Sequence, residues 1–154
     1  MGQASPRPVP VVFLDASVLI AGALSASGAS RAVVQFGEHT LLELRWTPRI
    51  LRETYRNLVQ TKGSEALAYY VKLVAKSKDA LVPDVTDKEI ARWTMLTDPK
   101  DAHVLAGAAR AKATDLLTLD RAHLLTPRVL SAKLPFQVQT PAAFLDNLRR
   151  SLQA

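Results

Sequence analysis

The sequence contains no cysteine, which excludes disulfide bonds and any metal site built on thiolates. A metal would therefore be held by oxygen atoms and by some of the three histidines. The chain also lacks a long uninterrupted apolar run, because its most apolar stretch, residues 9–24, is broken by Pro10, Asp15, Ser17 and Gly22. We therefore expect no membrane span and no secretion signal. These absences favour a cytoplasmic protein.

Acidic residues are the minority among the charged residues, with 14 Asp and Glu against 20 Lys and Arg and a net charge of +6. This excess favours a polyanionic partner such as a nucleic acid, although an ordinary basic surface would give the same balance. The 154 residues, 48% of them hydrophobic, suffice for one domain with a substantial core. We expect a flexible lead-in over residues 1–8 and a single domain over residues 9–154.

The order of the predicted elements indicates an α/β fold, a three-layer α/β/α sandwich around a small, mostly parallel sheet. Apolar runs predict strands at residues 9–14, 41–46, 115–120 and 136–138, with an edge strand or extended connector at 81–83. Capping residues, prolines and apolar spacing predict helices at residues 17–24, through 32–36, at 48–60, from 64, at 86–96, at 99–113 and from 141. Val71 and Leu152 are among the positions expected to face the core.

The first predicted strand is followed directly by Asp15. Its unbroken apolar run, residues 9–14, is typical of a strand covered on both faces. In open α/β folds, ligands bind beyond the carboxyl ends of the strands, so Asp15 is a candidate site residue. An aspartate is also a common helix N-cap, and Asp15 alone does not identify a site.

Three further aspartates are expected at the same edge of the sheet. Asp120 ends another buried strand, and Asp98 and Asp101 begin the helix predicted from Pro99. The carboxyl ends of parallel strands and the N-termini of the helices that follow them share one edge, so these side chains should converge on Asp15. Capping roles remain open, with Asp98 as the N-cap before Pro99 and Asp101 as its capping-box partner.

Glu53 lies inside the helix predicted over residues 48–60. Its helical spacing from Arg49 and Arg56 leaves an exposed ion pair as the alternative to a role in the site. Carboxylates gathered in one place repel one another unless a cation lies between them. Mg²⁺ and Mn²⁺ prefer oxygen ligands, and the chemistry they support in such a site is phosphodiester hydrolysis by an activated water.

Residues 15–20, Asp-Ala-Ser-Val-Leu-Ile, resemble the opening motif of PIN domains, small nucleases that include the toxins of VapBC-type toxin–antitoxin pairs. Residues 98–105 and 117–121 are similar to the third and fourth acidic motifs of that family, and the helix carrying Glu53 is similar to the segment that supplies the second. The resemblance extends over most of the chain. It implies a catalytic, metal-binding quartet of Asp15, Glu53, Asp101 and Asp120, supported by Ser17, Asp98 and Thr118.

The resemblance implies an endoribonuclease that depends on Mg²⁺ or Mn²⁺ and acts on RNA as a toxin paired with a separate antitoxin protein. It also implies a homodimer, for which the helix starting at Ser64 is a possible surface. Two alternatives stay open, a PIN-like scaffold that binds RNA or protein without cleavage, and an RNA-processing nuclease outside a toxin system. The basic residues expected to hold RNA phosphates, or else to be solvated surface charges, are Lys100, Arg121, Arg49 and Arg52.

Two rival protein classes, one of them enzymatic, fit the sequence less well. Phosphotransferases of the haloacid-dehalogenase type need a second Asp two residues after the first, where this chain has Ser17. A receiver-type signalling domain needs an earlier acidic pair and a late lysine beside the site, and neither is apparent. His103 and His123 lie near the acidic motifs, but a histidine near a helix is more often packed or exposed than a ligand, and we assign them no role.

Overall fold

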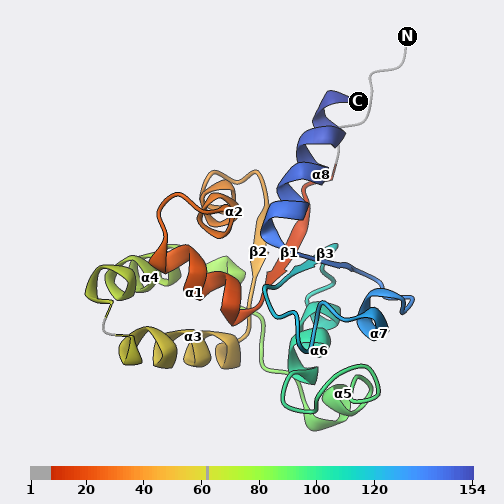
Figure 1. The fold of residues 1–154 in the computed structure, drawn as a ribbon. Coiled ribbons are helices and arrows are strands. Elements are labelled where there is room, and N and C mark those ends of the chain that lie inside the picture. Colours follow the sequence, from red (N-terminus) through yellow and green to blue (C-terminus); the bar gives the residue numbers. More distant parts are fainter. Residues whose placement is uncertain (1–7, 62) are drawn as a thin grey trace.

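The computed structural model describes residues 8–61 and 63–154, and these form a four-stranded parallel sheet between layers of helices (Figure 1). The strands lie in the order β2-β1-β3-β4, with bounds Glu43–Arg45, Val11–Leu14, Asp115–Leu117 and Gln137–Gln139. All three neighbouring pairs are parallel, which confirms the predicted α/β/α sandwich. The predicted lead-in, residues 1–8, lies outside the described residues except for Pro8.

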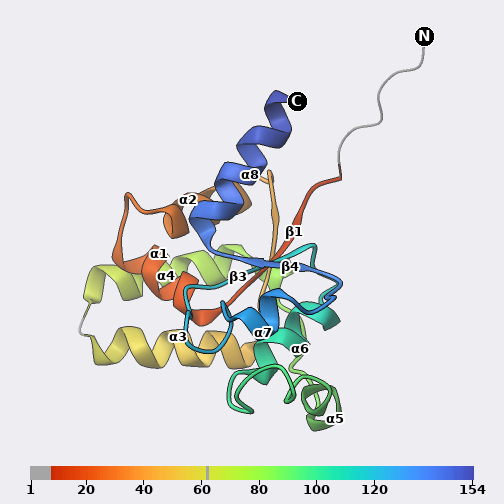
Figure 2. The ribbon, with the colours of Figure 1, turned by 45° about the vertical axis from the view of Figure 1, so that its right-hand side comes forward.

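The helices fill the connections between the strands, as parallel pairing requires (Figure 2). Threonine side chains accept backbone N–H groups at the starts of several of them, including the predicted starts at Thr47 and Thr140 and the predicted capping box at Thr86. Their bounds are α1 Ala16–Leu24, α2 Ala29–Glu38, α3 Pro48–Gln60, α4 Ser64–Lys76, α5 Asp87–Ala91, α6 Ala102–Arg110, α7 Pro127–Leu130 and α8 Pro141–Gln153, with a 3-10 turn at Lys78–Ala80.

Strand β1 is the centre of the core. Val12, Phe13 and Leu14 have no exposed surface, as the unbroken apolar run predicted for a strand covered on both faces. Helix α6 lies close against this strand, because a Cβ atom at Gly107 would lie 2.6 Å from the ring of Phe13. This close approach places the start of α6, and with it Asp101, next to the carboxyl edge of the sheet.

Several predicted boundaries are wrong. Helix α6 begins at Ala102 rather than at Pro99, because the Asp98 carboxylate accepts the Lys100 N–H and holds residues 98–101 in a turn. Ser17 lies inside α1 and does not cap it, since Asp15 takes that position. The first three strands are shorter than predicted, and β4 begins one residue later than predicted. The stretch at 81–83 contributes only a parallel bridge between Leu81 and Trp46 among the described residues.

Two side chains predicted to be buried are exposed. Val71 is 53% exposed, because α4 buries Ala66, Tyr70 and Leu73 and Val71 lies beside that stripe. Leu152 is 71% exposed, because the last turn of α8 projects beyond the sheet (Figure 1). No single helix in the described ranges has the length and apolarity to cross a membrane, and α1 and α2 meet that criterion only as a pair bent by 97°.

Candidate active site

Asp15 follows β1 directly, and hydrogen bonds fix its carboxylate from several sides. One carboxylate oxygen accepts the N–H of Ala16 at 2.8 Å, which makes Asp15 the N-cap of α1. The other oxygen accepts the hydroxyls of Ser17 at 2.9 Å and Thr118 at 2.7 Å. The capping role and the position at the sheet edge, considered above as alternatives, therefore occur together.

Burial strongly affects the charge of Asp15, which is only 7% exposed. Burial raises the pKa of the Asp15 carboxyl and the negative charge of Asp120 raises it further, while the hydrogen bonds from Thr118, Ser17 and Ala16 oppose both effects. A nearby cation would reverse this destabilisation of the charged form.

Asp120 is linked to Asp15 through the hydroxyl group of Thr118. The Thr118 hydroxyl that donates to Asp15 accepts the backbone N–H of Asp120 at 3.0 Å. One carboxylate oxygen of Asp120 accepts the N–H groups of Ala122 and His123, each at 3.0 Å. These bonds fold the chain after β3 into a turn, which brings the His123 ring to the acids.

Asp101 has a carboxylate oxygen that makes no hydrogen bond with the described residues. It precedes α6, but its side chain does not cap the helix. Its Oδ2 is buried and makes no hydrogen bond with any described residue. Burial raises the pKa of Asp101, Asp120 adds to the effect, and Lys100 and His123 oppose it. The Nδ1 atom of His123 lies at ion-pair distance, 3.2 Å, but makes no hydrogen bond to this oxygen. Buried polar atoms normally have hydrogen-bond partners, so the oxygen fits a site where a ligand supplies one.

Asp101, Asp120 and His123 could share one cation. The His123 Nδ1 atom lies 3.2 Å from Oδ2 of Asp101 and 3.5 Å from Oδ2 of Asp120, and one ligand atom from each residue falls within 4.8 Å of the others. Two carboxylates and an imidazole suit a divalent first-row metal, and the carboxylates suit Mg²⁺. The orphaned oxygen and this donor set together fit a bound divalent cation.

Glu53 is an exposed residue of α3, but its carboxyl group is partly surrounded by protein and lies near the other acids. Burial raises the pKa of Glu53, and the charges of Asp15 and Asp101 raise it further, while Arg49 and Lys100 lower it. No basic group among the described residues lies within ion-pair distance of Glu53, so the predicted alternative of a surface salt bridge is not formed there. Glu53 and Asp101 line one cleft.

The cleft that Glu53 and Asp101 line, called the acid cleft below, has a volume of about 560 Å³. Most of its other lining residues are basic. Helix α3 presents Arg49, Arg52 and Arg56 to it, and the turn before α6 contributes Lys100; His103 completes the lining. Three of the four basic residues expected to contact RNA therefore lie together. Arg121 does not join them, because it lines a separate hollow of about 280 Å³ near the starts of α2 and α8. Asp98 is exposed and does not line the cleft.

The sequence interpretation missed both histidines near the acids. His123 lies beside Asp101 and Asp120, and its three-residue spacing from Asp120 was the available signal. His103 is 4% exposed on α6. Burial lowers the pKa of His103 to about 4, with the charge of Arg49 acting in the same direction.

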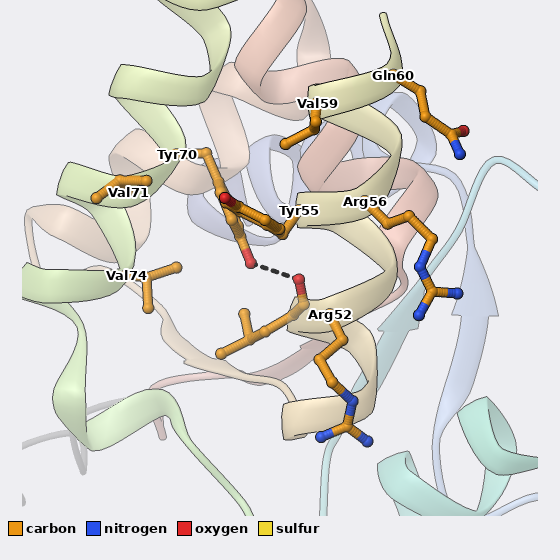
Figure 3. A pocket seen from close by; sticks show the side chains of 9 residues that line it. Arg52, Tyr55, Arg56, Val59, Gln60, Tyr70, Val71 and Val74 are labelled. Atoms are coloured by element: carbon orange, nitrogen blue, oxygen red, sulfur yellow. Dashed lines mark hydrogen bonds between the residues drawn. The ribbon is translucent and has the colours of Figure 1, made fainter.

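A second hollow, of about 610 Å³, lies between α3 and α4 and is largely apolar. Figure 3 shows Val71 and Val74 of α4 across from Tyr55 and Val59 of α3, while Arg52 and Arg56 point away from α4. The Tyr70 hydroxyl donates to the Leu51 carbonyl at 2.8 Å and joins the two helices. Burial raises the pKa of Tyr70 to about 12.

A family model described as the PIN domain matches residues 11–122, and the chain therefore belongs to the PIN domain family. PIN domains are generally nucleases, and the acid cluster agrees with that class. A search of curated protein sequences finds no match.

Solved structures share this fold at low sequence identity. PAE2754 from Pyrobaculum aerophilum superposes with a TM-score of 0.61 and 18% identity, covering 92% of this chain and 91% of that one. VapC20 from Mycobacterium tuberculosis, a sarcin-ricin loop cleaving toxin, superposes with a TM-score of 0.51 and 16% identity, covering 72% of this chain and 91% of that one.

Proposed function

We propose that this PIN domain is an endoribonuclease dependent on Mg²⁺ or Mn²⁺, with Asp15, Glu53, Asp101 and Asp120 as its acidic quartet. The observation that carries the proposal is the buried Oδ2 of Asp101, which has no hydrogen-bond partner among the described residues and lies next to Asp120 and His123. The raised pKa values of Asp15, Glu53 and Asp101 support it: burial and, to a smaller extent, repulsion among the carboxylates disfavour their charged forms, and a bound cation offsets both effects.

Asp101 and Asp120 would hold the cation, with Asp15 and Glu53 completing the quartet and His123 adjacent. Such a cation, when bound, lowers the pKa of a water molecule and offsets charge on the phosphoryl group. Ser17 and Thr118 are positioning residues, because their hydroxyls fix one oxygen of Asp15. Asp98 supports the site through the turn that sets the place of Asp101.

RNA is the proposed substrate class, and the basic side of the acid cleft supports it. Arg49, Arg52 and Lys100 lie beside Glu53 and Asp101, where they would hold the phosphates that flank the scissile bond. The net charge of +6 acts in the same direction at longer range. Arg121 would contact a more distant phosphate, because it lies outside the cleft.

The finer biological role that we propose is that of a toxin held by a separate antitoxin chain, supported by the likeness to VapC20. We also propose a homodimer that uses the exposed apolar side chains of α3 and α4, where Tyr55, Val59 and Val71 are each about half exposed (Figure 3). Sedimentation of the purified chain tests the dimer, and a monomer at all concentrations would contradict it.

Cleavage of RNA by the Asp15→Asn protein tests the proposed activity. We expect metal-dependent cleavage by the wild-type chain and none by the variant, with unchanged circular dichroism. Asp146→Asn is the matched control, because Asp146 is an exposed aspartate on α8 whose nearest basic partner is Arg149 at 3.9 Å. Undiminished cleavage by the Asp15 variant would refute the proposal.

A further inference from the structure

The imidazole of His103 lines the acid cleft and has no hydrogen-bond partner among the described residues. It is 4% exposed at the second position of α6, and it makes no hydrogen bond with any described residue. Its remaining exposed surface faces the acid cleft, which it lines together with Glu53 and Asp101. The ring nitrogens are not among the buried unpaired side-chain atoms of the described residues, so they remain accessible from the cleft, where a ligand can bond them.

His103 differs from the rest of the cleft lining. The other described lining residues carry full charges, positive on Arg49, Arg52, Arg56 and Lys100 and negative on Glu53 and Asp101. Those charges suit phosphates and a cation. An imidazole instead offers a ring N–H donor and a ring nitrogen acceptor, which suit a hydroxyl group.

The position of His103 indicates which part of a nucleic acid would meet it. It follows Asp101 by two residues, and Asp101 and Glu53 of the proposed quartet line the same cleft. A scissile phosphate bound beside these two acids would bring its adjoining ribose to this wall. The ribose 2′-hydroxyl both donates and accepts hydrogen bonds, and it is the group that distinguishes RNA from DNA.

We propose that His103 binds the 2′-hydroxyl of a ribose next to the scissile phosphate and thereby gives the enzyme its preference for RNA over DNA. The inference rests on the proposed nuclease function and names a specificity residue for it. A site built to bond a hydroxyl discriminates against the analogue that lacks it, because the polar group of the protein is left unpaired.

The experiment compares His103→Leu with His103→Gln, which keeps a polar side chain, on two probes. The probes are a randomised single-stranded RNA and the DNA of matched length, both with Mn²⁺. We expect the ratio of RNA to DNA cleavage to fall about tenfold in the Leu variant, the effect of one lost hydrogen bond, and to fall less in the Gln variant. Circular dichroism checks that each variant is folded.

A second experiment changes the substrate, and its main comparison uses only the wild-type enzyme. RNA with a single 2′-deoxy nucleotide is placed in turn on each side of a mapped cleavage site and offered to the wild-type enzyme. We expect one position to slow cleavage about tenfold, and the same change to have no further effect in a folded His103 variant. A wild-type enzyme indifferent to the deoxy nucleotide on either side would overturn the inference.

A binding measurement separates this inference from the proposed function. Fluorescence anisotropy of the same RNA and DNA is measured with Asp15→Asn protein, with and without His103→Leu. If the wild-type chain cleaves RNA but the variant keeps the full RNA preference, the assignment of His103 is wrong and the nuclease function stands. If nothing is cleaved, the nuclease function fails, and the binding ratio decides: its loss in the His103 variant supports the inference, and its retention overturns it.

Discussion

The hydroxyl of Thr118 joins the first and last acids of the proposed quartet: it donates to the Asp15 carboxylate at 2.7 Å and accepts the Asp120 backbone N–H at 3.0 Å. Asp15 and Thr118 are 103 positions apart in the chain, yet their side chains meet because β1 and β3 are neighbours. The side chain of Thr118 has no exposed surface, so water does not substitute for these bonds. The placement of two acids thus depends on one buried hydroxyl.

Thr118→Val should weaken both the fold and the activity. Valine has nearly the same shape but leaves the Asp120 N–H unpaired and removes one donor from Asp15, at a cost of about 1–3 kcal/mol in the free energy of unfolding. Thr118→Ser is the control, because it keeps the hydroxyl. Urea unfolding and RNA cleavage measure the two effects, and equal activity of the Val and Ser variants would show that the bridge does not position the acids.

The stability of the metal-free protein should depend on the ionisation of Asp15. Burial raises the folded-state pKa of Asp15 above its ordinary value of 3.8, so its stabilising contribution is complete below that value and is lost as the pH rises through the raised pKa. Asp101 and Glu53 have raised pKa values and act in the same direction. The apoprotein should therefore lose stability from these groups as the pH rises toward neutral.

Asp15→Asn should reduce this loss and leave the metal-free protein at least as stable as wild type near neutral pH. Thermal unfolding in the presence of a chelator, measured across the pH range, gives the comparison. A variant whose midpoint follows the wild-type pH dependence without change would contradict the assignment to Asp15.

Added Mn²⁺ should stabilise the wild-type chain. A cation that binds only the folded state adds about 2.7 kcal/mol at one hundred times its dissociation constant. Asp101→Asn should abolish most of this gain, because it removes the charge at the oxygen without a hydrogen bond, whereas Asp146→Asn should keep it.

The binding of Mn²⁺ should also weaken as the pH falls, because protons compete with the cation at the three carboxyls with raised pKa values. Calorimetry with Mn²⁺ that gives no heat for wild type would favour a scaffold that does not cleave RNA.

The cleft arginines should set the salt dependence of RNA binding. Replacing Arg49 or Arg52 with Gln should reduce the slope of log affinity against log salt by about 1 for each phosphate that is no longer neutralised by the protein. The Arg52 variant also removes an exposed ion pair with Asp84 at 3.4 Å, which contributes little to stability. Arg150→Gln, in the last turn of α8, should leave the slope unchanged. Identical slopes for all three variants would place the RNA elsewhere.

The sequence was sufficient to predict the sheet edge on which the acids meet. Asp15 and Asp120 follow apolar runs long enough to be recognised as buried strands, and parallel strands end at a common edge. The start of α3 was equally clear, because Thr47 and Pro48 form a strong local signal for a helix start.

Features that depend on tertiary geometry could not be predicted in the same way. His123 reaches Asp101 only because Asp120 accepts the N–H groups of the two residues after Arg121 and turns the chain back. The turn at residues 98–101 delays α6, since the Asp98 side chain bonds the Lys100 backbone instead of capping a helix at Pro99. Arg121 follows Asp120 directly, yet it lines a different hollow.

The central position of β1 also determines when the site can form during synthesis of the chain. Its neighbour β3 is more than a hundred residues away in sequence, and the Asp15 backbone N–H pairs with the Leu117 carbonyl across that separation. Contacts between such distant segments form late in folding, after local helices such as α3. Before β3 has left the ribosome, the growing chain therefore carries Asp15 and Glu53 without Asp120. The acid cluster cannot assemble on the ribosome until synthesis has passed Asp120.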